Sequence, residues 1–158
     1  MKAGFLLVTA LVLAVLCLGS ASIAMAQSIT GGGLLRDNPN NSLVSLSVVA
    51  SPRGGIVQLT AGPLGFRLLG NVVDLCVVDN AAIAVIQITQ SSVEGFPIGS
   101  FTPLVFEDNG KTGDRFGLFT GASEEFVPCS EIVEFLDFIL ATDADVQPLT
   151  RGNITITP

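Results

Sequence analysis

Residues Phe106-Glu107-Asp108-Asn109-Gly110-Lys111-Thr112-Gly113-Asp114-Arg115-Phe116 place a glycine-rich acidic turn between two apolar segments. Asn-Gly is a favoured turn pair, and aspartate side chains often accept hydrogen bonds from backbone N–H groups in such turns. The stretch therefore predicts a hairpin. We expect a strand over Phe101–Glu107 to enter the turn and a strand over Arg115–Thr120 to leave it.

Further strands are predicted upstream, where apolar and polar residues alternate between Gly- and Pro-containing turns. They cover Leu43–Ser51, Ile56–Ala61, Gly65–Leu69, Val72–Val78 and Ala81–Thr89. The last of these is apolar on both sides as far as Gln87, which predicts a central strand covered on both faces. Before them, Gly31-Gly32-Gly33 predicts a bend or bulge where backbones pass closely, and Leu34–Asn41 predicts a loop. The spacing indicates an all-β fold, a single antiparallel sandwich or barrel.

One segment near the C-terminus departs from this pattern. Ser130 is a candidate cap for a helix over Glu131–Leu140. An apolar face at helical spacing favours packing on the domain, and the alternative is an exposed interaction helix. This face contains Ile132, Phe135, Leu136 and Ile139. An acidic loop over Ala141–Gln147 and a short closing strand at Ile154–Ile156 complete the chain.

The first 26 residues predict a signal peptide, because Lys2 precedes an apolar run that ends at Ala24-Met25-Ala26. Cleavage between Ala26 and Gln27 leaves residues 27–158 as a single β domain without a membrane span. A retained anchor is the alternative, but the apolar run is shorter than the roughly 20 residues that a spanning helix needs. A lipoprotein at Cys17 is disfavoured because Leu16 stands where a small residue is expected. We expect a secreted protein, extracellular or in the cell envelope.

Two cysteines, Cys76 and Cys129, remain after this cleavage. In an exported chain they predict one disulfide, and free thiols are the alternative.

Composition excludes several classes of function. The chain has no His, Trp or Tyr, so a Ser-His triad is absent. After loss of Lys2, six basic residues face fourteen acidic ones. Such an acidic domain is a poor partner for nucleic acid or for anionic lipid.

Two groups of acidic residues are candidate sites. Asp108 and Asp114, with Gly110 and Thr112 between them, could ligate Ca²⁺, and the alternative is turn capping. We expect no other cofactor. The second group could supply the paired carboxylates of a hydrolase, although the aromatic platforms typical of glycosidases are missing. It consists of Glu124, Glu125 and Glu131.

Four stretches in this order resemble the post-COAP family of small domains in secreted bacterial proteins. They are Ile29–Gly33, Val72–Ile83, Asp108–Gly110 with Gly113–Phe116, and Gly152–Ile156. The resemblance implies a secreted all-β domain of uncharacterised activity and supplies no catalytic residues.

Together these features predict an exported, non-enzymatic β domain with a structural or interaction role. Its expected partner is an envelope or extracellular protein or polysaccharide. A Ca²⁺- or carbohydrate-binding module is the alternative, and a carboxylate-dependent hydrolase is less favoured.

Overall fold

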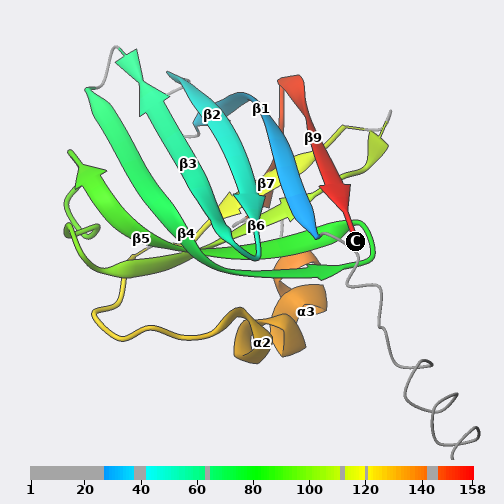
Figure 1. The fold of residues 1–158 in the computed structure, drawn as a ribbon. Helices are drawn as coiled ribbons and strands as arrows, with labels where there is room; N and C mark the ends of the chain where they lie inside the picture. Colours follow the sequence, from blue (N-terminus) through cyan, green and yellow to red (C-terminus); the bar gives the residue numbers. More distant parts are fainter. Residues whose placement is uncertain (1–26, 38–41, 63–64, 111–112, 120, 142–145) are drawn as a thin grey trace, which may run out of the picture.

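The structure is a computed structural model that describes residues 27–37, 42–62, 65–110, 113–119, 121–141 and 146–158. The predicted signal peptide, including Cys17 and Ala26, lies outside this part of the chain. What is described is one antiparallel sheet curled into a half-barrel, with a short helical segment packed against its outer face (Figure 1). The all-β prediction, with one short helix near the C-terminus, is confirmed.

The sheet contains nine strands among the described residues, in the order β8-β7-β6-β5-β4-β3-β2-β1-β9. From β1 to β8, strands that follow one another along the chain are neighbours in the sheet. The bounds are β1 Ser28–Asp37, β2 Ser42–Ser51, β3 Gly54–Ala61, β4 Phe66–Val78, β5 Ala81–Ser91, β6 Phe101–Glu107, β7 Arg115–Leu118, β8 Val146–Pro148 and β9 Arg151–Thr157.

Two predictions for the strands that precede β5 were wrong. Leu34–Asp37, predicted as loop, belongs to β1, which pairs with β2 on one side and β9 on the other. Gly31 makes the second pairing possible, because a Cβ atom there would lie 2.1 Å from the carbonyl oxygen of Asn153. The two segments predicted between residues 65 and 78 form one strand, β4, whose register with β5 shifts near Gly70 and Val72.

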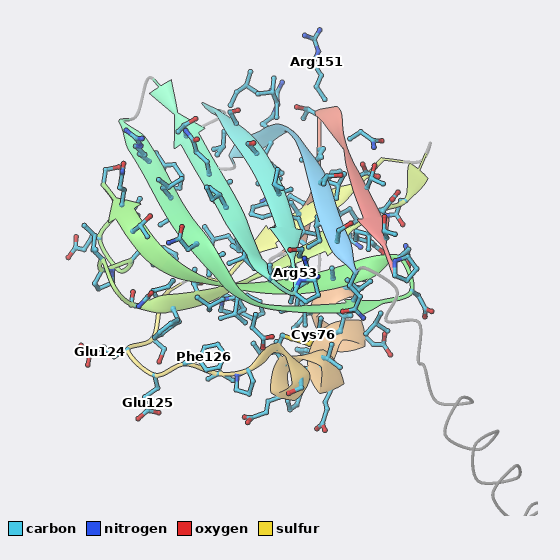
Figure 2. The ribbon with its side chains drawn as sticks, viewed as in Figure 1. Arg53, Cys76, Glu124, Glu125, Phe126 and Arg151 are labelled. Atoms are coloured by element: carbon cyan, nitrogen blue, oxygen red, sulfur yellow. A yellow bond between two sulfur atoms is a disulfide. The ribbon has the colours of Figure 1, made fainter. Side chains whose placement is uncertain are left out.

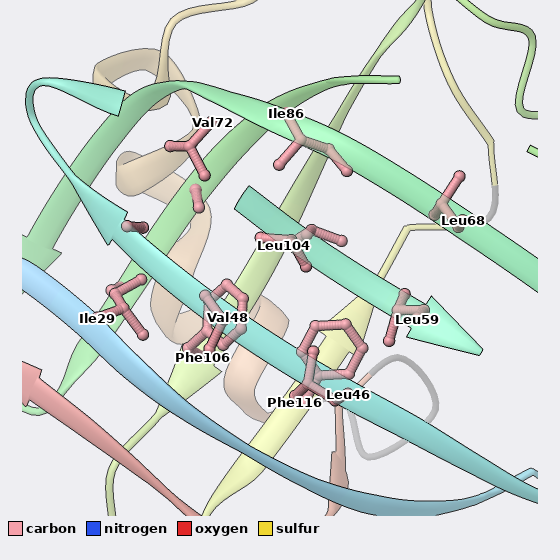
Figure 3. Packing of buried hydrophobic residues seen from close by; sticks show 14 of the residues in the cluster. Ile29, Leu46, Val48, Leu59, Leu68, Val72, Ile86, Leu104, Phe106 and Phe116 are labelled. Carbon is pink, nitrogen blue, oxygen red and sulfur yellow. The ribbon is translucent and has the colours of Figure 1, made fainter. Parts of the chain in front are cut away.

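The hydrophobic core occupies both faces of β5. Ala82, Ala84, Ile86 and Ile88 face the concave interior, where side chains from all around the half-barrel pack together (Figure 3). Ala81, Ile83 and Val85 belong to a second cluster with the helical segment on the convex face. The prediction of a central strand covered on both faces is confirmed.

The C-terminal segment joins the two edges of the curled sheet. Val146–Pro148 pairs with β7 at one edge, and Arg151–Thr157 pairs with β1 at the other. Between these strands, the Leu149 N–H donates to the Asp114 carbonyl oxygen over 2.8 Å, and the Thr150 N–H donates to the Leu34 carbonyl oxygen over 2.7 Å. The predicted closing strand is therefore present, and it is longer than Ile154–Ile156. The loop predicted over Ala141–Gln147 was wrong at its C-terminal end, because Val146 and Gln147 pair with β7 as part of β8.

The helical segment is a run of three short pieces rather than one regular helix. They are α2 Cys129–Ile132, a 3₁₀ turn η3 Val133–Phe135, and α3 Leu136–Ala141. Ser130 is not the cap, because Pro128 occupies the capping position and makes no side-chain bond there. Leu136 and Ile139 are buried, so the segment packs on the domain, but Phe135 was wrongly assigned to the packed face and is 61% exposed. No helix in the described ranges is long and apolar enough to cross a membrane.

Candidate functional site

Asp108 and Asp114, the predicted calcium ligands, bind backbone N–H groups of β9. The side chain of Asp108 accepts from Gly110 over 3.0 Å and from Ile156 over 3.2 Å. The Asp114 side chain, only 3% exposed, accepts from Asn109 over 3.1 Å and from Ile154 over 2.5 Å.

These contacts fit the geometry of an edge strand. Alternate N–H groups of a strand point to the same side, and β1 occupies the other side of β9. The outward N–H groups of Ile154 and Ile156 would lack strand partners, and the two carboxylates supply charged acceptors instead. The turn between β6 and β7 thus holds the C-terminal strand across the opening of the half-barrel.

A metal role for these carboxylates stays a prediction. Each carboxylate already accepts two N–H donors, so a cation would have to compete with those bonds. Among the described residues, no group of three or more Asp, Glu, Cys or His side chains is arranged to hold a metal ion.

Cys76 and Cys129 lie at disulfide distance, with Cα atoms 5.8 Å apart. The predicted pair therefore joins β4 to the start of the helical segment. Asp74, two residues before Cys76, accepts a hydrogen bond of 2.8 Å from the Cys129 N–H. Sequence reasoning missed this second tether, although an acidic residue is a favourable partner for the N–H groups that begin a helix.

The proposed hydrolase carboxylates do not form a buried pair. Glu124 and Glu125 lie in an exposed loop beside Phe126 (Figure 2). Glu131 belongs to α2 and is also exposed. The Glu125 N–H donates to Ser123 Oγ over 3.0 Å. The paired carboxylates of a hydrolase flank a substrate in a cleft, and these exposed positions do not form such a pair.

The outer side of the helical segment exposes aromatic side chains, which the sequence analysis did not predict for the packed helix. Phe135 is 61% exposed and Phe138 is 71% exposed. Three exposed carboxylates share this side, and we call the five residues the phenyl–carboxylate face. Its members are Glu131, Glu134, Phe135, Asp137 and Phe138.

The spacing of these residues brings rings and carboxylates together. Glu131 precedes Phe135 by four positions and Glu134 precedes Phe138 by four, and residues so spaced are neighbours on a helix surface. Within the described chain, the three carboxylates make no side-chain hydrogen bond or ion pair. Phe138 could have been found from sequence, because it lies three residues after Phe135.

A second exposed apolar pair lies on the convex face of the sheet. Val49 and Ile56 are directly opposite each other in β2 and β3 and are 61% and 55% exposed. Their cross-strand neighbours, Thr30 and Asn71, are uncharged. Val49 and Ile56 are thus about as exposed as Phe135 and Phe138, but their cross-strand neighbours carry no carboxylate.

Comparison of the chain with models of known protein families finds no match. Searches of curated proteins and of solved structures likewise find none. The post-COAP resemblance therefore rests on the four sequence stretches alone, and the functional argument rests on the surfaces described above.

Proposed function

We propose that this chain is an exported, non-enzymatic β domain that serves as a protein-interaction module at or outside the cell envelope. The observation that carries the proposal is the exposure of Phe135 and Phe138 on one side of a helical segment whose other side is buried. Isolated exposed apolar residues are common on protein surfaces, but clustered aromatic side chains favour a binding role.

The concave side of the sheet is less suited to binding. Its interior is filled by large side chains, among them Leu59, Leu104, Phe106 and Phe116, all of them buried (Figure 3). A ligand there would have to displace tightly packed core residues, which costs more than binding on an exposed surface. The outer surface is therefore the better candidate, and the predicted export together with the Cys76–Cys129 pair favours an oxidising compartment.

Site-directed photocrosslinking tests this proposal in the producing cells. A benzophenone side chain replaces Phe138, and in a matched control it replaces Ile56, which has comparable exposure on the sheet. We expect a discrete crosslinked protein from position 138 and none from position 56. The adduct should disappear when Phe135→Ser is added, because the neighbouring ring contributes to the same surface.

Other outcomes overturn the proposal. The absence of an adduct at position 138, or equal adducts at both positions, would remove the helical segment as the binding surface. A heterogeneous carbohydrate adduct would support the polysaccharide-binding alternative instead. Calorimetric titration with CaCl₂ separately tests the calcium alternative, which requires heat of binding that is lost in Asp108→Asn.

A further inference from the structure

The phenyl–carboxylate face carries negative charge that no basic side chain in the described part of the sequence neutralises. Residues 121–141 contain five acidic residues and no basic residue. Glu131, Glu134 and Asp137 are exposed and have no side-chain partner in the described part of the chain. Arg115, whose guanidinium binds the carbonyl oxygen of Leu140 in the helical segment, does not supply a free cation. It also binds Glu107 and the carbonyl oxygen of Val146.

Charge is also divided unevenly along the chain. Residues 74–145 hold thirteen acidic residues against two basic ones, Lys111 and Arg115. Residues 27–73 and 146–158 together hold four arginines against one acidic residue, Asp37. The part of the sequence that contains the helical segment is therefore strongly acidic. Such a surface attracts cationic partners and repels anionic ones.

We propose that the phenyl–carboxylate face binds a basic, partly apolar polypeptide segment, in which lysine or arginine residues alternate with apolar residues. This inference rests on the proposed function and names the chemistry of its partner. Apolar side chains of such a segment cover Phe135 and Phe138, while its cations reach the carboxylates. Because each ring has a carboxylate four residues before it, a bound cation also lies close to an aromatic ring, which adds a cation–π attraction.

Fluorescence anisotropy with three synthetic amphipathic peptides tests the inference on residues 27–158. The peptides share their leucine positions and carry lysine, serine or glutamate at the polar positions. We expect the lysine peptide to bind most tightly and its affinity to fall with added salt. Glu134→Gln with Asp137→Asn should weaken its binding about tenfold, as should Phe135→Ser with Phe138→Ser.

A matched control distinguishes binding at the phenyl–carboxylate face from non-specific attraction of the lysine peptide to an acidic protein. Asp79→Asn with Glu94→Gln removes the same charge from exposed positions outside the helical segment and should leave the affinity unchanged. Equal losses from both charge pairs would overturn the inference, and so would equal binding of the serine or glutamate peptide.

The two proposals can fail separately. If the phenylalanine changes abolish peptide binding and the Glu134–Asp137 changes do not, the interaction module stands and the preference for a basic partner is wrong. If the domain sediments as a concentration-dependent oligomer that the lysine peptide dissociates, the occupant is a second copy of this chain, and the inference of a separate basic partner is overturned.

Discussion

Replacing Asp114 by alanine tests whether the turn between β6 and β7 holds the C-terminal strand. The side chain is 3% exposed and accepts N–H groups from Asn109 and Ile154. An unsatisfied buried N–H costs about 1–3 kcal/mol. We assign about 2 kcal/mol to the buried Ile154 donor and about 1 kcal/mol to the Asn109 donor, which water can reach. The free energy of unfolding should therefore fall by about 3 kcal/mol.

Urea unfolding of residues 27–158 measures this loss, which corresponds to a midpoint shift of about 2 M for a domain of this size. Amide hydrogen exchange adds a local measurement. Asp114→Ala should accelerate exchange at Ile154, whereas Asp108→Ala should accelerate exchange mainly at Ile156. Asp137→Ala, at an exposed carboxylate without a side-chain partner in the described chain, should change stability by less than about 0.5 kcal/mol.

A loss below about 1 kcal/mol with unchanged exchange at Ile154 would refute this reasoning. If Ca²⁺ also stabilised the wild-type domain and not Asp114→Ala, the two carboxylates would be metal ligands rather than backbone acceptors. The calcium hypothesis and the structural account thus predict opposite results from the same pair of proteins.

Two further predictions concern the cross-link and the turn. Cys76→Ser with Cys129→Ser should lower the free energy of unfolding by about 4 kcal/mol, because the bridge closes a loop over a separation of 53 residues. Alkylation followed by mass spectrometry should label neither cysteine in the exported protein before reduction, and labelling without reduction would contradict the bridge. Gly110→Val should cost about 1–2 kcal/mol in urea unfolding, because Gly110 has φ +57° and no atom within 4 Å of a built Cβ, so strain and not collision is the cause. A neutral Gly110→Val would contradict this conformation.

The sequence predicted those parts of the fold in which local pattern and tertiary structure agree. The two-sided apolar run of β5 and the hairpin around Asn109-Gly110 are examples. β1 was missed because its glycines and polar residues do not alternate as in a half-buried strand. Its stability comes from pairing on both sides, and one partner, β9, lies more than a hundred residues away.

The roles of Asp108 and Asp114 could likewise be predicted only in part from the local sequence. Turn capping by Asp108 was one of the alternatives at the sequence level, and its bond to Gly110 is of that kind. The acceptor role toward Ile154 and Ile156 depends on how the sheet curls, because the sequence separation is 40 for Asp114 and its partner and 48 for Asp108 and its partner. A motif of one turn carries no information about such distant donors.

The orientation of the helical segment links the disulfide to the proposed binding surface. From its apolar residues alone, either of two overlapping sides of this segment could be buried. One side contains Phe135, and the other contains Val133 and Leu140. Cys129 precedes Leu136 by seven positions, so both lie on nearly the same side of a helix, and Cys129 faces Cys76 in β4.

The contact between Cys129 and Cys76 therefore turns the side with Val133 and Leu140 toward the sheet, and both residues are partly buried. Phe135 and Phe138 then face outward. Each ring therefore keeps more than half of its surface exposed to water. Phe135→Ser with Phe138→Ser should leave the unfolding midpoint nearly unchanged while weakening binding of the lysine peptide about tenfold. A large loss of stability in this variant would mean that the rings serve the fold, and that the exposed face is not a binding surface.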